Sequence, residues 1–284
     1  MAKRQQPGQR VGALLRVPPG PVDLRTIDAR ATPGFSGRKR DALAEREALA
    51  DRLSDLQERL YAEGRTGGTR SLLLVLQGLD TSGKGGTVRH VAGAVDPQGV
   101  QLAAFKAPTR EERAHDFLWR IKRRLPAPGM IGVFDRSHYE DVVVVRVHEL
   151  VPRSQWSRRY ATINRFEERL LTAGTRIVKC YLHISPEESR ARQLARLDDP
   201  TKHWKFNPRD LDERALWNDY LDAYGDALER CNTEAAPWHV VPADRKWYRN
   251  WAIANLLIEE LEAMAVEWPP ATFDVEEQRR RLLA

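Results

Sequence analysis

A ten-residue segment from Gly78 to Thr87, with the sequence GLDTSGKGGT, contains the residue types that bind phosphate. Its glycines allow backbone N–H groups to point inward at phosphate oxygens, and its lysine adds a point charge. The segment lies between an apolar run and a predicted helix, whose N-terminus adds positive potential. This position favours a phosphate site over a ligand-free, glycine-rich helix start. The predicted phosphate-binding residues are Gly78, Thr81, Ser82, Gly83, Lys84, Gly85, Gly86 and Thr87.

The segment departs from an ordinary phosphate-binding loop at two positions. The G-x-x-x-x-G-K spacing is present, but Gly85 replaces the serine or threonine that usually binds magnesium. Thr87 comes two residues too late to take that place by position. Asp80 supplies a carboxylate inside the loop, which ordinary loops of this kind lack. We therefore predict that Asp80 lies near the phosphates and binds magnesium.

A second carboxylate, Asp135, follows an apolar run at residues 130–134 that has the length of a strand, and Arg136 comes next. Open α/β folds bind ligands at the carboxyl ends of their strands. A carboxylate there can bind magnesium, and an arginine can neutralise phosphate charge during transfer. Without the loop, such an aspartate would more often be a helix cap. The predicted catalytic residues are Asp80, Lys84, Asp135 and Arg136, with Asp80 and Asp135 as metal ligands.

Two basic clusters could extend the phosphate surface. Between residues 105 and 124, seven basic and three acidic side chains leave a net charge of +4. A solvated helix face would also explain this cluster, and Lys106, at the end of a predicted strand, is its best functional candidate. The second cluster occupies a predicted lid at about residues 186–212, in a helix and a loop that could close over phosphate. Its members are Arg190, Arg192, Arg196, Lys202 and Lys205.

Strand-length apolar runs that alternate with helical segments must position these residues. Such runs lie at 71–77, 100–105, 130–134, 177–184 and 238–241. The helices are predicted from Thr109 to about Arg124, where Thr109 and Glu112 form a capping box, from Ser154 to Gly174, after Ser185 and after Asp244. This alternation predicts an α/β fold of three layers, with a mainly parallel sheet covered on both faces.

The N-terminal region has a different composition. Residues 1–40 are rich in proline and glycine, which predicts an irregular arm lying over a single domain at residues 41–284. From Arg38 to Gly64 the leucine spacing predicts one helix. Its apolar stripe is too short for a lasting coiled coil, so we expect it to dock on its own domain rather than form an oligomer seam.

Composition limits the class of protein. The 284 residues include 46 Lys and Arg and 40 Asp and Glu, and the charge of +6 suggests a polyanionic partner: nucleic acid, a membrane surface or a phosphate compound. Cys180 and Cys231 are the only cysteines and have no spacing typical of a disulfide scaffold or a zinc site. We found no apolar run that could span a membrane and no secretion signal, so we expect a cytoplasmic location.

Three motifs in order resemble polyphosphate kinase family 2, and specifically its class III branch. They are the loop Gly78–Thr87 with its internal aspartate, FDRSHYEDV at 134–142 and KHWKF at 202–206, within a resemblance that covers about residues 70–250. The resemblance implies a P-loop kinase fold with a helical lid. It also implies reversible transfer of a terminal phosphoryl group from inorganic polyphosphate to AMP and ADP, forming ADP and ATP, with Mg²⁺, or Mn²⁺ as an alternative.

Matched by position, the family's loop aspartate and lysine, its strand-end aspartate and the adjacent arginine are Asp80, Lys84, Asp135 and Arg136. The resemblance suggests that Tyr139 and Glu140 seat the nucleotide base. Polyphosphate is expected along Arg89, Lys106 and the basic lid residues, and Trp204 and Phe206 are expected to pack under the lid. We expect a homo-oligomer that binds polyphosphate and adenine nucleotides, with no nucleic-acid or membrane partner.

Two other functions fit part of this pattern. An ATP-dependent nucleoside monophosphate kinase can carry an aspartate in its loop, but it normally keeps a hydroxyl residue where this chain has Gly85. A non-catalytic polyanion-binding protein would need the basic residues but not the paired aspartates. FDRSHYEDV also argues against the first alternative.

Overall fold

The computed structural model describes residues 10–284 and contains one five-stranded sheet. Its strands are all parallel and lie in the order β2-β3-β1-β4-β5. The central strand β1 is buried at every position, as its continuous apolar run predicts. The predicted α/β class with a parallel sheet is confirmed. The strands are β1 Ser71–Gln77, β2 Val100–Ala104, β3 Ile131–Asp135, β4 Thr175–His183 and β5 Trp238–Pro242.

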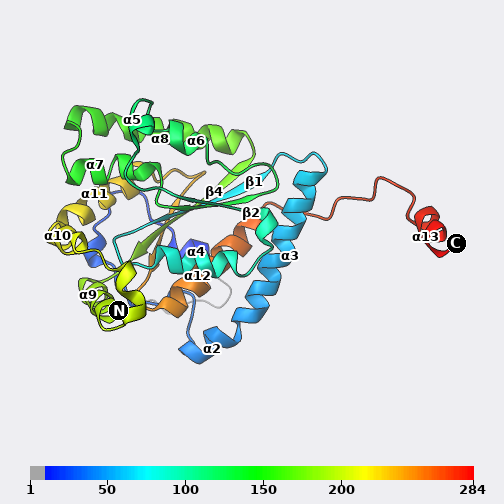
Figure 1. Ribbon diagram of the computed structural model, residues 1–284, viewed down its shortest axis with the longest axis horizontal. Coiled ribbons are helices and arrows are strands. Elements are labelled where there is room, and N and C mark those ends of the chain that lie inside the picture. Colours follow the sequence, from blue (N-terminus) through cyan, green and yellow to red (C-terminus); the bar gives the residue numbers. More distant parts are fainter. Residues whose placement is uncertain (1–9) are drawn as a thin grey trace.

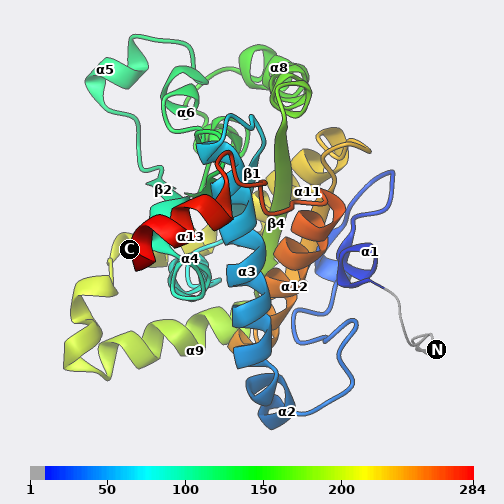
Figure 2. The ribbon, with the colours of Figure 1, turned by 90° about the vertical axis from the view of Figure 1, so that its right-hand side faces the viewer.

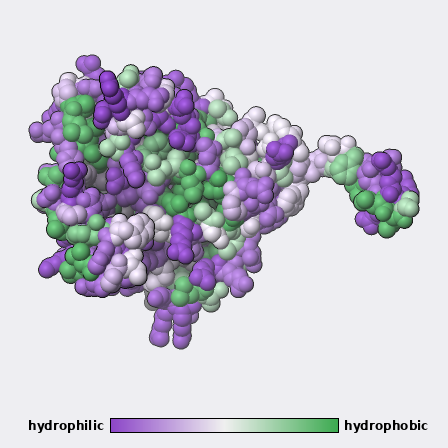
Figure 3. Space-filling model, viewed as in Figure 1, coloured by the Kyte–Doolittle hydropathy of each residue, from purple (hydrophilic) through white to green (hydrophobic). Residues whose placement is uncertain are grey.

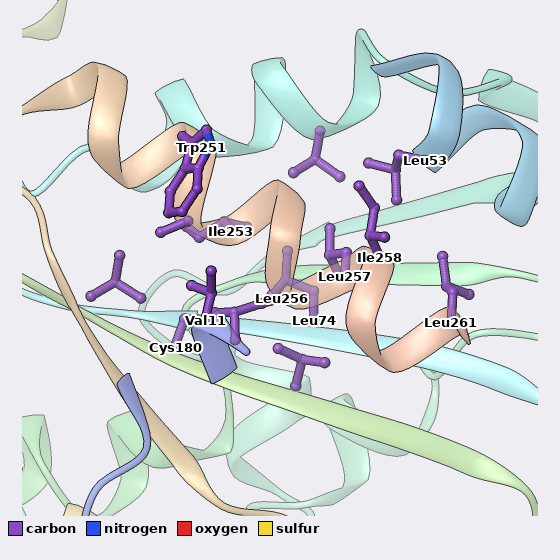
Figure 4. Close-up of a cluster of buried hydrophobic side chains, with 14 of the residues drawn as sticks. Val11, Leu53, Leu74, Cys180, Trp251, Ile253, Leu256, Leu257, Ile258 and Leu261 are labelled. Carbon is purple, nitrogen blue, oxygen red and sulfur yellow. The ribbon is translucent and has the colours of Figure 1, made fainter. Parts of the chain in front are cut away.

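Helices cover both faces of the sheet, which gives three layers (Figure 1). Alternate residues of β1 enter two hydrophobic cores, because successive side chains of a strand point to opposite faces. The first core, shown in Figure 4, packs Leu74 of β1 against Leu53 and Leu257. Its covering helices are α3 Arg46–Arg65, α4 Lys84–Ala92 and α12 Lys246–Ala263. The second core packs under α8 Arg153–Thr172 and α11 Trp217–Arg230.

Shorter elements connect these layers. Within residues 10–284 no helix is both long and apolar enough to cross a bilayer. The shorter α-helices are α1 Val11–Leu15, α2 Lys39–Ala44, α5 Arg110–Arg113, α6 Trp119–Lys122, α7 Val144–Val147, α9 Pro186–Leu197, α10 Arg209–Ala215 and α13 Val275–Leu283. The 3₁₀ turns are η1 Leu24–Thr26, η2 Pro97–Gly99, η3 His138–Asp141 and η4 Pro200–Lys205.

Two helices that were predicted as continuous are each divided into two helices. The capping box of Thr109 and Glu112 is present, but the helix expected to run to Arg124 is split into α5 and α6. The Asp116 carboxylate accepts the N–H of Leu118, 3.0 Å away, and this local bond competes with the helical pattern. The helix expected from Arg38 to Gly64 is likewise two helices, α2 and α3, although its predicted docking on its own domain is confirmed.

The described part of the N-terminal arm lies over the body, as expected, but it is not wholly irregular because it contains α1. The N–H of Val17 donates to the carbonyl of Trp238 in β5, 2.8 Å away, and that of Val11 donates to Glu259 of α12, 2.6 Å away. Val11 is buried in the first core and Val17 in the second. The arm therefore covers the edge of the sheet at β5 and joins both cores. Residues 1–9 lie outside the described part.

The C-terminal segment was not anticipated. After α12 the chain leaves the body and ends in α13, which Figure 1 shows at the end of an extended connection. In Figure 2, viewed from that side, α13 lies in front of the body. The space-filling view in Figure 3 shows it as a separate lobe with both hydrophobic and hydrophilic side chains on its surface.

Candidate active site

The glycine-rich loop joins β1 to α4, as predicted, and close contacts require two of its glycines. Gly78 and Gly83 have φ angles of 146° and 103°, a region that favours glycine. A Cβ at Gly78 would lie 2.7 Å from the carbonyl oxygen of Leu182, and one at Gly83 would lie 1.7 Å from Nη1 of Arg249. Thr81 also has a positive φ, of 65°. The backbone is therefore folded as tightly as a phosphate-binding loop requires.

Arg192 holds this loop from behind. Its guanidinium donates to the carbonyls of Thr81 and Ser82, at 2.8 and 3.3 Å, and to those of Ala243 and Asp244, at 2.7 and 2.8 Å. A fifth bond, from Nε, goes to Glu188 at 2.8 Å. All five donors of the guanidinium are thus used within the protein. The expectation that Arg192 contacts phosphate from the lid is corrected, because its side chain is buried and turned toward the loop backbone.

Arg249 of α12 supports the loop at a neighbouring point, and nothing in the sequence pointed to it. Its Nη1 donates to the carbonyl of Ser82, 3.2 Å away, and its other nitrogens donate to Asn250. Burial and the nearby charge of Arg192 lower the pKa of Arg249 to about 10. Because both arginines bind loop carbonyls, they fix the peptide orientation that a phosphate would meet.

Lys84 is buried at the start of α4, and its ammonium donates to the carbonyls of Gly78 and Leu79, at 2.7 and 3.3 Å. Burial lowers the pKa of Lys84, and Arg136 lowers it further, whereas Asp80, Asp135 and Glu140 oppose this shift. The loop lysine and the predicted carboxylates therefore share one electrostatic environment.

Arg136 lies at the carboxyl end of β3 and connects two acids. Its Nη2 is 3.2 Å from Oδ1 of Asp80, and its Nη1 is 3.6 Å from Oε2 of Glu140. Burial disfavours its charge, but Glu140 and Asp80 outweigh that effect and raise the pKa of Arg136. Its φ is 65°, an uncommon value for a residue other than glycine and one often found at functional sites. The structure thus brings Asp80 and Arg136 together, as predicted.

A cavity of about 490 Å³ opens beside these groups. The predicted lid segment, through α9 and α10, supplies one wall, and α11 supplies another. The residues of α10 and α11 carried no motif, so sequence reasoning missed them. The lining residues are Gly78, Leu79, Asp80, Arg136, Glu140, Val144, Ser189, Gln193, Asp210, Glu213, Arg214, Trp217, Tyr220 and Tyr224.

The basic residues predicted for the lid do not line this cavity. Arg196 lies 3.7 Å from Asp210, and Lys202 lies 2.6 Å from Asp199, so both face carboxylates of the lid itself. Arg214, just beyond the predicted lid and in α10, does line the cavity. Trp204 is 79% exposed and does not pack under the lid as expected. The other predicted lid residues, Arg190 and Lys205, are exposed.

The strand-end basic cluster is also divided. Lys106 is exposed and borders a separate hollow at the edge of the sheet, beside β2. Arg120, counted in the same +4 stretch, is buried and lies 3.5 Å from Asp141 and 3.9 Å from Glu112. Part of this cluster therefore stabilises the fold instead of facing solvent.

The prediction that Tyr139 seats the nucleotide base is wrong. It is fully buried, its hydroxyl donates to Oε1 of Glu167 at 2.8 Å, and the ammonium of Lys179 donates to that hydroxyl at 3.1 Å. It cannot touch a base from this position, because its ring is enclosed in the second core and does not line the cavity. Glu140 does line the cavity. Burial raises the pKa of Glu140, although Arg136 and Lys84 oppose the shift.

A second, broader groove of about 1120 Å³ runs along α4 and begins at Gly86 of the glycine-rich segment. Gly86 and Arg89 line it, together with Arg46 and His90. Arg89 was predicted as a phosphate contact, and the structure places it next to the loop. Two separate hollows therefore border the loop. The first combines four acids and two arginines with aromatic side chains, and the second contains Arg46, Arg89 and a single acid, Glu47.

The carboxylates at the loop and at the end of β3 are candidate ligands of a magnesium ion. Within residues 10–284 no three His, Cys, Asp or Glu side chains form a ready-made metal cluster. Magnesium usually binds through one or two carboxylates together with substrate phosphates and water. Asp80 and Asp135, which both act on the charge of Lys84, supply such hard oxygen ligands. The residues present fit an ion that binds with phosphate.

Comparison with known proteins adds an independent finding. The sequence profile of the family "Polyphosphate kinase 2 (PPK2)" matches residues 37–269. The AMP/ADP-polyphosphate phosphotransferase of Meiothermus ruber is 46% identical over 252 residues, which cover 89% of this chain and 93% of that protein. The ADP-polyphosphate phosphotransferase of Rhodopseudomonas palustris is 45% identical over 234 residues, covering 78% and 80%. The crystal structure of Polyphosphate Kinase 2 from Arthrobacter aurescens TC1, 53% identical, superposes with a TM-score of 0.95 and covers 97% of each chain.

Proposed function

The chain belongs to the polyphosphate kinase 2 family, and we propose that it transfers the terminal phosphoryl group of inorganic polyphosphate reversibly to both AMP and ADP, forming ADP and ATP. It is an enzyme that transfers phosphoryl groups between polyphosphate and nucleotides. The use of both acceptors is supported by the name of the Meiothermus ruber relative.

The observation that carries the proposal is that two separate hollows both include residues of the glycine-rich segment. The nucleotide acceptor is assigned to the cavity of Asp80, Arg136 and Glu140, whose wall includes Trp217 and Tyr220 as apolar surfaces for a base. Polyphosphate is assigned to the groove of Gly86 and Arg89, where arginines can pair with phosphate oxygens. Both substrates then meet at the loop, as in-line transfer requires.

The chain's own residues act by positioning and charge neutralisation. A nucleotide phosphate is largely ionised near pH 7, so no side chain needs to remove a proton from the attacking oxygen. Lys84 exchanges its carbonyl partners for phosphate oxygens, and Arg136 offsets the charge of the acceptor phosphate while Asp80 and Glu140 hold its guanidinium. When bound, Mg²⁺ (or Mn²⁺) would be held by Asp80 and Asp135 and would neutralise further phosphate charge.

The decisive experiment supplies AMP, Mg²⁺ and purified polyphosphate, without ATP, and follows products over time. We expect ADP first and then ATP. Product formation with ATP but not with polyphosphate as donor would instead support a nucleoside monophosphate kinase. Binding of polyphosphate without any product would support a non-catalytic polyanion-binding protein. A Lys84→Met variant is the matched inactive control.

We also propose a cytoplasmic location and a homo-oligomeric state. Cys180 and Cys231 are free and buried, which suits a reducing compartment. Size measurement in solution and localisation of a tagged chain test these two points.

A further inference from the structure

The C-terminal tail, defined as residues 265–284, has few contacts with the body. At its start, the guanidinium of Arg59 lies 6.0 Å from the ring centre of Trp268. Beyond that point the tail runs to α13, which Figure 1 shows well away from the rest of the fold. The interactions described for α13 are local, such as the cap from Asp274 to the N–H of Glu277 at 3.0 Å.

The tail exposes a concentration of large apolar side chains. Val275 and Leu282 are seven residues apart and therefore share one face of α13, with Leu283 beside them. Leu282 and Leu283 are 87% and 83% exposed, and Phe273, just before the helix, is 60% exposed. A nine-residue helix is marginal in water without tertiary contacts. Both features indicate that α13 packs on another surface.

Part of the tail has a counterpart in a solved structure. The Arthrobacter aurescens chain covers 97% of the 284 residues, which leaves only about nine residues unmatched, fewer than the 20 of the tail. At least half of the tail is therefore matched there, at a TM-score of 0.95. A helix held at a distance from its own body needs a partner, and the partner always present for a homo-oligomer is a second copy.

A suitable receiving surface lies at the opposite end of α3. It is an apolar hollow of about 600 Å³, called here the α3–α12 groove, lined by Leu43, Leu49, Leu53, Trp247 and Trp251 with Arg46 at its rim. Leu43 is 46% exposed. The acidic first turn of α13, with Glu276 and Glu277, complements the charge of Arg46.

We propose that α13 docks in the α3–α12 groove of a second copy of this chain, so that two copies exchange their tails. The tail contacts α3 at Arg59, whereas the groove includes Leu49 and Leu53 of the same helix, about 9–15 Å away along its axis. Antiparallel pairing of two α3 helices would place each exit beside the other copy's groove. The six residues 269–274, between Trp268 and α13, can span at most about 20 Å, which is enough to reach a groove on a second copy paired along α3. A two-fold axis makes both contacts equivalent.

Sedimentation of the full chain tests the exchange. Wild type should be a dimer or a larger even oligomer, and Leu282→Glu/Leu283→Glu or Leu43→Glu alone should shift it to monomers or half-size species. Leu150→Glu, at an exposed leucine of another surface, is the matched control and should leave the size unchanged. A monomeric wild type, or tail and groove variants that keep the wild-type size, would overturn the proposal.

Crosslinking distinguishes exchange from folding back. A Leu282→Cys chain is mixed with a Leu43→Cys chain of different mass and oxidised. A disulfide joining the two masses is expected. A disulfide that forms only within a Leu43→Cys/Leu282→Cys double variant, at monomer size, would show that the tail binds its own groove and would refute the exchange. Neither readout depends on enzymatic activity.

Discussion

The arginines that bind the backbone of the loop have a different role from the arginine that faces the cavity. Arg192 and Arg249 bind loop carbonyls, whereas Arg136 faces the cavity. We predict that Arg192→Lys lowers the free energy of unfolding by about 2–4 kcal/mol, because several buried hydrogen bonds at about 1 kcal/mol each are lost. Thermal or urea unfolding measures this. Arg190→Lys, on an exposed position of the same helix, is the control; equal stability of the two variants would contradict the role.

Asp135 should be needed for chemistry and not for folding. Asp135→Asn keeps the shape of the side chain but removes the charge that is expected to bind Mg²⁺. We predict that turnover with polyphosphate falls by about a hundredfold or more, with unchanged unfolding. Steady-state kinetics over a range of Mg²⁺ concentrations checks this, with exposed Asp219→Asn as control. Near wild-type turnover would remove Asp135 from the site.

Glu140 should give the reaction a pH dependence. Burial raises its pKa, so on acidification it takes up a proton above the pH range usual for glutamate and loses its charge interaction with Arg136. Nucleotide affinity, measured as KM, should therefore weaken as the pH falls toward that range. In the Glu140→Gln variant, the KM for the nucleotide should not rise over this acidic pH range. If KM rises equally at acidic pH in the wild type and the variant, another group is responsible for the pH dependence.

Residues within local motifs were predictable, and those assembled by the fold were not. Asp80, Lys84 and Arg136 were identified because loop and strand end meet at one edge of a parallel sheet. Arg249 lies far along the chain, in a helix without a motif. Tyr139 was misplaced because its direction depends on the 3₁₀ turn η3, and spacing alone does not reveal that turn.

At the scale of elements, the loop offers a matched pair of glycines. Gly83→Ala places a Cβ 1.7 Å from Arg249, at a φ of 103°, whereas a Cβ at Gly85 meets nothing within 4 Å. We predict that Gly83→Ala lowers the free energy of unfolding by about 2 kcal/mol or more. Gly85→Ala, in the first turn of α4, should be neutral or slightly stabilising. Chemical denaturation compares them, and equal losses would contradict the strain argument.

Buried elements were more predictable than surface ones. The strand β1 was predicted with its observed ends, because an apolar run buried on both faces has no competing explanation. The prediction of one helix over the region of α5 and α6 was wrong, because the hydrogen bond from the N–H of Leu118 to the Asp116 carboxylate competes with helix formation. The direction of the tail could not be predicted at all, since apolar spacing does not say which surface an element covers.

At the scale of the whole molecule, His239 links pH to the attachment of the arm. It lies in β5 opposite Arg16 of the arm, and burial lowers its pKa to about 4. Above the ordinary histidine pKa of about 6.5 the ring is neutral in both the folded and the unfolded chain and does not make stability depend on pH. As the pH falls from 6.5 toward 4, the unfolded chain takes up a proton first, so the free energy of unfolding decreases. We predict that stability declines across this window.

Unfolding between pH 7 and pH 4 measures this decline. His239→Gln, which cannot be protonated, should flatten it. A variant with the same slope as wild type would place the responsible group elsewhere.

The N-terminal arm also sets an order of events during synthesis. Val11 binds Glu259, a partner 248 residues later, and Val17 binds Trp238. A ribosome that adds about 5–20 residues per second needs on the order of 12–50 s to make that partner. The apolar side chains of the arm, although made first, must therefore wait exposed on the nascent chain, where chaperones can bind them, until α12 has emerged.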